Sequence, residues 1–277
     1  MNQRLPTFSW LSAIVVTAAV LIADNSHASP QWDGDGGFSG DYSNIARLRW
    51  TGPGSPDTYA QYLARRGSTP FRSSLISSSN AKSRGSRIQK VLVIVNSALY
   101  AGIQTRLNTY VNDLTADGYA VDVYQNSGGT CVDMKNFILG NVSDLVGCVF
   151  VGDQPSAWFE HDYWGPEEFP CDLFYMDLDG TWTDTDTDGM YDAHAAGSGD
   201  EGPEIFVGHI DASMMSGNEV DITNDYFDKN HLYRLGGIPH SGYALTYTED
   251  DWASIPSQRT DIKYAYGDTG FDDVSIQ

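Results

Sequence analysis

Seven aspartates between positions 172 and 192 form the densest group of potentially reactive side chains in the sequence. Asp184, Asp186 and Asp188 stand at alternate positions, and Gly189 follows them where a sharp turn would be needed. Carboxylates at this spacing can converge on one hard cation that takes oxygen ligands, and calcium is the natural choice. The spacing therefore predicts a calcium loop.

The predicted ligand set extends beyond the three alternate aspartates. Met190 would offer its backbone carbonyl and Asp192 a direct or water-mediated carboxylate, while Asp177 and Asp179 form a second acidic turn upstream. Ala195 stands where the closing glutamate of an EF-hand would fall, so the pattern is that of a free extracellular calcium loop. The alternative is a solvated acidic turn without a specific ion, although the mutual repulsion of seven carboxylates argues against it.

Candidate nucleophiles are few, because the sequence holds only three cysteines. Cys148 lies in an apolar run and is expected to be a packed core residue. Cys171 precedes Asp172 in the acidic region, where neighbouring carboxylates would raise the pKa of its thiol and make it a poor nucleophile. At most one disulfide can form, and the pairing of Cys131 is left open.

Histidines could serve as bases, but none lies in a sequence context typical of catalysis. A packed, hydrogen-bonded role is expected for His209, which interrupts an apolar strand, whereas His161 and His194 fall in predicted loops. The sequence contains no Gly-x-Ser-x-Gly elbow, phosphate-cradling loop or zinc-type His/Cys cluster. The sequence therefore assigns no catalytic residue.

Alternating strands and helices begin at Lys90 and must position these side chains. The expected strands cover 91–95, 120–124, 145–151 and 205–210. The expected helices cover 103–114, 131–139 and 218–235, and Gly118 should end the first of them. This alternation predicts an α/β fold with a parallel sheet, helices on both faces, and working loops beyond the carboxyl ends of the strands.

Four segments can be distinguished along the chain. Residues 1–28 carry a basic flank, an apolar run and small residues at a cleavage-type position, which is typical of a secretory signal peptide; an uncleaved anchor is the alternative. Residues 29–88, rich in Gly, Ser, Pro and Arg, are expected to be a leader, a linker or a pro-segment, with a short helix around 58–65. Residues 89–240 would hold the α/β unit with the calcium loop, and residues 241–277 would begin a second, truncated unit.

Charge is unevenly distributed between these segments. Residues 31–90 hold nine Lys and Arg against four acids, whereas residues 91–277 hold six against 32. A field of that sign repels nucleic acid and anionic lipid and favours cations or a basic segment. We therefore expect no nucleic-acid partner, no membrane contact beyond export, and a basic leader that could dock on the acidic remainder. Solubility alone would also explain the acidic surface.

The order of four short motifs resembles that of the gingipain-type cysteine peptidases. The motifs are Val149–Asp153, Cys171–Tyr175, Asp177–Gly180 and Pro203–Ile210. The resemblance covers about residues 90–251 and implies a caspase-like three-layer fold with a mostly parallel sheet in two related halves, the second of which is truncated. It also implies that the catalytic His and Cys belong to the second half. Because the sequence contains no His-Gly pair, we expect that dyad beyond Gln277 and the chain itself to be inactive.

The resemblance also suggests a role for one carboxylate. Asp172 matches the residue that faces the P1 side chain in arginine-specific members, and a carboxylate there could pair with a basic residue of a protein or peptide substrate. Cys171 replaces the usual Ser of this motif, and His209 replaces the usual Arg of the last one. The expected function is thus a secreted, calcium-binding cysteine endopeptidase without its dyad. An extracellular, calcium-stabilised binding or structural module is the alternative, and the oligomeric state is open.

Overall fold

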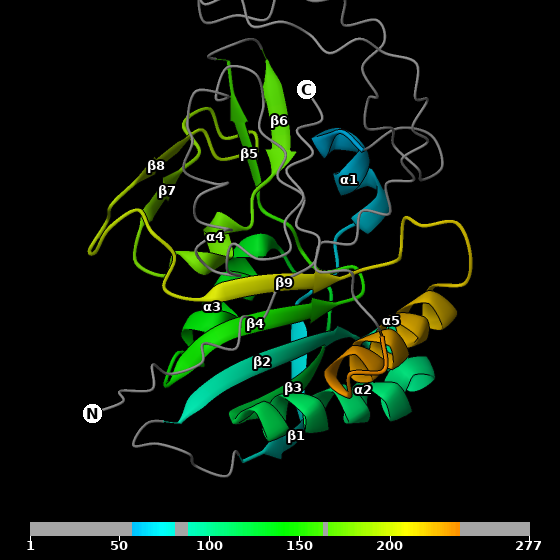
Figure 1. Ribbon diagram of the computed structural model, residues 1–277. Coiled ribbons are helices and arrows are strands. Elements are labelled where there is room, and N and C mark those ends of the chain that lie inside the picture. The colour runs from blue at the N-terminus through cyan, green and yellow to red at the C-terminus, as the bar shows by residue number, and fades with distance from the viewer. Residues whose placement is uncertain (1–56, 81–87, 163–165, 239–277) are drawn as a thin grey trace, which may run out of the picture. The chain divides into compact units, whose positions relative to one another are not determined.

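A computed structural model of the chain describes residues 57–80, 88–162 and 166–238. The predicted signal peptide, most of the leader segment and the predicted second unit at 241–277 lie outside the described residues. A five-stranded sheet with the order β1-β3-β2-β4-β9 forms the centre of the domain (Figure 1). Its strands are β1 (Arg72–Ser79), β2 (Gln89–Asn96), β3 (Tyr119–Ser127), β4 (Leu145–Val151) and β9 (Phe206–Ile210).

Four of the five strands run parallel, with β2 in a central position. Val93 of β2 pairs with Val123 of β3 on one side and with Val149 of β4 on the other, and β9 continues the parallel order beyond β4. The continuous apolar sequence of β2 follows from this position, because a central parallel strand is covered on both faces. Among the strands of the described residues, β1 alone is antiparallel in this sheet, which is therefore mixed but mostly parallel.

Helices cover both faces of the sheet (Figure 1). Val91, Val93 and Val95 belong to the core shared with α2 (Ser97–Asp117) and α5 (Glu219–Arg234). Leu92 and Ile94, which point the opposite way, belong to the core shared with α3 (Cys131–Leu139) and α4 (Leu173–Met176). The predicted α/β class with helices on both faces is confirmed.

Local capping signals fix the helix ends. Asn96 caps α2 by accepting the Ala98 N–H at 2.9 Å, and Gly118 ends the helix in the left-handed conformation with φ 106°. Thr130 and Asp133 form a reciprocal capping box at the start of α3. The predicted bounds of α3 and β4 agree with the structure at both ends, and the predicted stop at Gly118 is confirmed.

Residues 57–80 belong to the segment expected to be a leader, a linker or a pro-segment, and they include one strand of the central sheet. β1 pairs along its length with β3, from Arg72 opposite Ser127 to Ser79 opposite Val121, and so belongs to the central sheet. α1 (Tyr59–Arg66) also packs on the domain and buries Tyr62. Serines dominate β1, so its sequence lacks the alternating apolar pattern on which strand prediction depends.

Two small hairpins stand beyond the central sheet (Figure 1). They are formed by β5 (Trp158–His161) with β6 (Glu167–Pro170), and by β7 (Thr181–Thr183) with β8 (Ala193–Ala195). The predicted calcium loop is the connection between β7 and β8. No described helix is both long and apolar enough to cross a membrane.

Candidate cation-binding loop and sheet edge

Backbone N–H groups hold the loop between β7 and β8 in a compact form. Asp184 accepts the N–H of Thr187 at 2.7 Å and the N–H of Gly189 at 3.0 Å. Asp188 accepts the N–H of Met190 at 2.8 Å, so each of these aspartates closes a turn of its own loop. Asp192 closes the other end, since its two carboxylate oxygens accept the N–H and the hydroxyl of Thr185.

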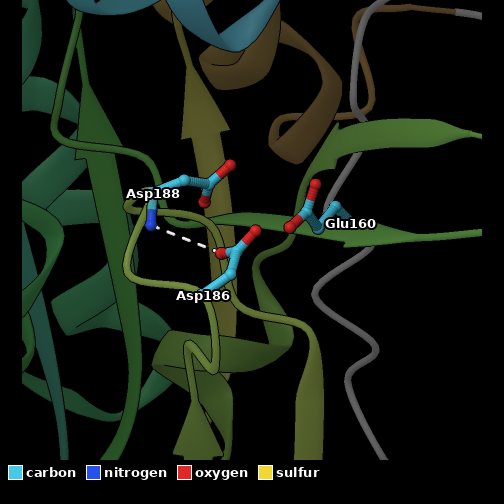
Figure 2. A group of neighbouring side chains, drawn as sticks. All are labelled: Glu160, Asp186 and Asp188. Carbon is cyan, nitrogen blue, oxygen red and sulfur yellow. Dashed lines mark hydrogen bonds between the residues drawn. The ribbon is translucent and has the colours of Figure 1, made fainter.

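Asp186 and Asp188 lie together with a third carboxylate, that of Glu160 in β5. Figure 2 shows these side chains, with the Asp188 N–H directed at Asp186 Oδ1. One carboxylate oxygen of each residue lies within 4.8 Å of the others, a spacing at which the three could hold one metal ion. Asp184 and Asp192 are neighbours in the loop but are not members of this three-carboxylate group.

Sequence reasoning missed Glu160, because no local signal connects it to the loop. Glu160 is brought there by β5, whose Trp158 and Glu160 exchange backbone hydrogen bonds with Tyr191 at 2.8 Å. Partial loss of hydration and then the charges of Asp188 and Asp186 raise the pKa of Glu160 above its ordinary value. A cation between the three carboxylates would relieve their mutual repulsion, which makes them candidate ligands.

Asp177 and Asp179 form a separate group with Glu204, away from the alternate aspartates. The side chain of Asp177 is fully buried, and its Oδ1 accepts the N–H groups of Asp179 at 3.1 Å and Gly180 at 2.7 Å. Its Oδ2 lies 2.5 Å from His194 Nε2. Burial alone would raise the pKa of Asp177, but the Gly180 N–H and His194 outweigh it and lower the pKa. The protein itself therefore supplies the partners of this carboxylate.

The structure thus divides the seven predicted ligand residues. Asp186 and Asp188 share a position suited to a cation, and Asp184 and Asp192 shape the loop around them. Asp177 organises the turn before β7, in a network that includes Lys135, whose ammonium group donates to the Asp177 carbonyl at 2.7 Å. An open hollow beside β5 and β6 continues the acidic surface; it is lined by Glu160, His161, Asp162, Pro166, Glu167, Glu168 and Asp192.

Asp172 is the residue to which the resemblance assigns substrate binding, and it lies near the carboxyl end of the sheet. Its Oδ1 lies 3.0 Å from His209 Nε2, and His209 packs edge-on against Phe150 of β4. The expectation of a packed, hydrogen-bonded role for His209 is confirmed. The Asp172 side chain remains 43% exposed, so a charged group from solvent can still approach it.

All three cysteines are free thiols with raised pKa values. Burial is the main cause in each case, strongest at Cys148 in the core of β4. For Cys171 the predicted direction is confirmed, although burial contributes more than the neighbouring Asp172. A thiol with a raised pKa is mostly protonated at neutral pH, so none of the three has the character of an activated nucleophile.

The fold and these sites define an α/β domain with a mostly parallel sheet, an acidic loop and a carboxylate at the sheet edge. Comparison with protein-family models, with curated proteins and with solved structures finds no match for this chain.

Proposed function

We propose that this chain provides the first, non-catalytic α/β half of a secreted cysteine endopeptidase of gingipain type, with a caspase-like fold. The observation that carries the proposal is the convergence of motifs that are distant in the sequence. Val149 of the first motif pairs with Gly208 of the last, and Asp172 of the middle motif contacts His209. This convergence supports one shared site at the edge of the sheet.

Tyr175 connects the Cys171–Tyr175 motif to the loop after β4. Its hydroxyl donates to the Pro155 carbonyl at 2.5 Å, and its ring packs edge-on against Phe150. The Cys171–Tyr175 motif is thereby held against the end of β4. Side chains held by buried packing and hydrogen bonds lose little freedom when a substrate binds, which is the requirement for a specificity site.

In the proposed enzyme, Asp172 binds a basic P1 side chain of a protein or peptide substrate, and the half-exposed carboxylate can accept a guanidinium group. The thiolate nucleophile and its histidine base come from a further part of the protein, as the resemblance implies. The contribution of this half is then to orient the substrate rather than to attack it.

Arginine binding tests the role of Asp172 without requiring catalysis. We expect N-acetyl-arginine amide to shift the imidazole NMR signals of His209, and Asp172→Asn to weaken that binding by about tenfold to a hundredfold, as for the loss of a charge-assisted hydrogen bond. Asp211→Asn is the matched control, because Asp211 follows the same strand but its carboxylate accepts the Ser213 N–H at 2.9 Å. Equal binding by wild type and Asp172→Asn would refute the proposed specificity role.

We also propose that Glu160, Asp186 and Asp188 hold calcium that stabilises the loop. Extracellular calcium sites can be weak, because calcium is abundant where a secreted protein works. Calcium at about a hundred times its dissociation constant should stabilise the fold by about 2.7 kcal/mol and raise the melting temperature. The double variant Asp186→Asn/Asp188→Asn should lose this rise, whereas Asp228→Asn, on the exposed face of α5, should keep it. An identical melt in calcium and in chelator would contradict the site.

One observation favours a second candidate function, a calcium-stabilised extracellular module without catalysis. Burial raises the pKa of all three thiols, so the described residues hold no activated thiol nucleophile. The proteolytic activity of the full-length protein distinguishes the two candidate functions. Cleavage of arginyl peptides that is blocked by a thiol-alkylating reagent supports the peptidase, and the absence of any cleavage supports the module.

A further inference from the structure

Helix α1 is attached to the domain through its aromatic side chains. The Tyr59 hydroxyl donates to the Gly189 carbonyl at 2.9 Å, and the Tyr62 hydroxyl accepts the Ser156 N–H at 2.8 Å. Both tyrosine rings pack against Trp158, with centroids 5.6 and 5.5 Å away, and Met190 completes this small cluster. The contacts come from long side chains, and the cluster is separate from the two cores of the sheet.

Two arginines at the end of α1 converge on one carboxylate. Arg65 Nη1 donates to Asp153 Oδ2 at 3.1 Å, and Arg66 Nη1 donates to Asp153 Oδ1 at 3.2 Å. Arg65 also donates from Nε to Asp57 at 3.0 Å, and both guanidinium groups lie within 6 Å of the Tyr62 ring centroid, at 5.9 and 5.8 Å. Asp153 is therefore neutralised by a segment from elsewhere in the chain.

Asp153 belongs to an acidic edge of the sheet. It lies two residues beyond the end of β4, after Gly152, and the Asn96 side-chain amide at the end of β2 donates to its carbonyl at 2.7 Å. Asp211 follows β9, and Glu219 begins α5. Burial, and then the charges of Asp211 and Asp153, raise the pKa of Glu219, which indicates that these carboxylates act on one another. The edge thus carries a negative field, and α1 brings positive charge to it.

We propose that α1 is an intramolecular ligand of this acidic edge: a strap that occupies a surface specific for a basic, aromatic helix and uncovers it when released. Residues 67–71 join α1 to β1, and β1 is fixed in the sheet. The strap can therefore detach while the sheet stays intact. Docking and release of the strap require neither a catalytic dyad nor a bound cation.

Charge should control how firmly the strap is held. The Asp153 side chain is 29% exposed and that of Arg65 is 35% exposed, so salt can screen their attraction. The tyrosine contacts with Trp158 are apolar and respond little to salt. Release should accordingly increase with ionic strength and should increase further when the arginines lose their charge.

Limited digestion of the full chain with chymotrypsin tests the strap, because cleavage after Tyr62 requires α1 to leave the domain. When opening is fast, the cleavage rate follows the population of the open form. We expect Arg65→Gln/Arg66→Gln, and independently Asp153→Asn, to accelerate this cleavage by about tenfold, the effect of losing about 1.4 kcal/mol of docking free energy. Arg106→Gln is the matched control, since it breaks an ion pair between α2 and α5 at 2.8 Å.

Binding in trans provides the second measurement. A labelled peptide of residues 57–66 should bind the Arg65→Gln/Arg66→Gln chain, whose own strap is loosened, and should bind much less when Asp153→Asn is added. Cleavage rates equal to those of Arg106→Gln would overturn the proposal. So would acceleration that follows a parallel fall in the melting temperature, because α1 would then open only with the whole domain.

Discussion

Asp177 illustrates how one buried carboxylate can organise a segment of chain. The sequence placed it in a cation site, yet its oxygens bind the N–H groups of the following turn and approach His194 of β8. His194 in turn stacks on Trp182 of β7, with ring centroids 4.1 Å apart. The carboxylate therefore connects the turn before β7 to the hairpin that carries the acidic loop.

Replacement of Asp177 should destabilise the domain even in the absence of divalent cations. Asp177→Asn keeps one acceptor oxygen but removes the buried negative charge and the oxygen that faces His194, and we expect a loss of about 2–3 kcal/mol in the free energy of unfolding. Urea unfolding in the presence of chelator measures it. Asp228→Asn, which removes an exposed ion pair, should change stability by less than about 0.5 kcal/mol. A similar value for both variants would show that Asp177 has no structural role.

Ionised Glu219 should destabilise the folded protein, and the size of this destabilisation should depend on pH. Its pKa in the folded state is raised by burial and by Asp211 and Asp153, so the folded chain binds more protons than the unfolded chain. The destabilisation is absent at low pH, grows as the pH rises through the ordinary value of 4.5, and is complete above the raised folded-state value.

Glu219→Gln should therefore stabilise the protein at pH 7, by about 0.5 kcal/mol after allowance for solvent screening, and should have little effect near pH 3.5. Urea midpoints at the two pH values measure the difference. Asp225→Asn in the same helix serves as a control for the general loss of one negative charge. A gain at pH 3.5 as large as that at pH 7 would be inconsistent with the raised pKa.

The sequence predicted which side chains lie together only where these residues are also close in the sequence. Asp186 and Asp188 are two residues apart, and their proximity follows from a short turn. Glu160 joins them through strand pairing with Tyr191, more than twenty residues away, which no local spacing encodes. Local geometry can be anticipated from the residues, but long-range contacts depend on the tertiary fold.

At the level of elements, helices and buried strands were anticipated closely because periodicity and caps act locally. The run at 91–95 is buried on both faces, and α2 ends where the Asp117-Gly118 pair suggested. α1 and β1 show what local sequence patterns do not predict. The helix around 58–65 was expected, but its packing on the domain and the pairing of the serine-rich β1 could not be derived from the local pattern.

Two glycines at helix ends offer a matched test of backbone conformation. Gly118 follows α2 with φ 106°, whereas Gly140 follows α3 with φ −66°. We expect Gly118→Ala to reduce stability by about 1 kcal/mol, because an L side chain is strained in the left-handed region, and Gly140→Ala to be nearly neutral. Chemical denaturation of both variants provides the comparison. Equal effects would mean that conformation does not determine the requirement for glycine.

For the whole molecule, stability should not depend on disulfide bonds. All three cysteines are free, and Cys148 is completely buried between the sheet and the α3 side of the core. The melting temperature should therefore be unchanged by a reducing agent, and Cys148 should react with a thiol reagent only after denaturation. Thermal melts with and without the reducing agent measure the first quantity, and colorimetric thiol titration before and after unfolding measures the second. A lower melting temperature under reducing conditions would indicate a covalent bond.

The polar character of β1 also affects how the protein behaves at high concentration. An exposed edge strand can pair with another chain, and apolar edges lead readily to aggregation. β1 covers the side of β3 mainly with serines, and its two exposed apolar side chains, Leu75 and Ile76, lie at an irregularity that disturbs regular pairing. The segment that looked least like a strand thus closes one border of the sheet with a surface that discourages further strands from joining it.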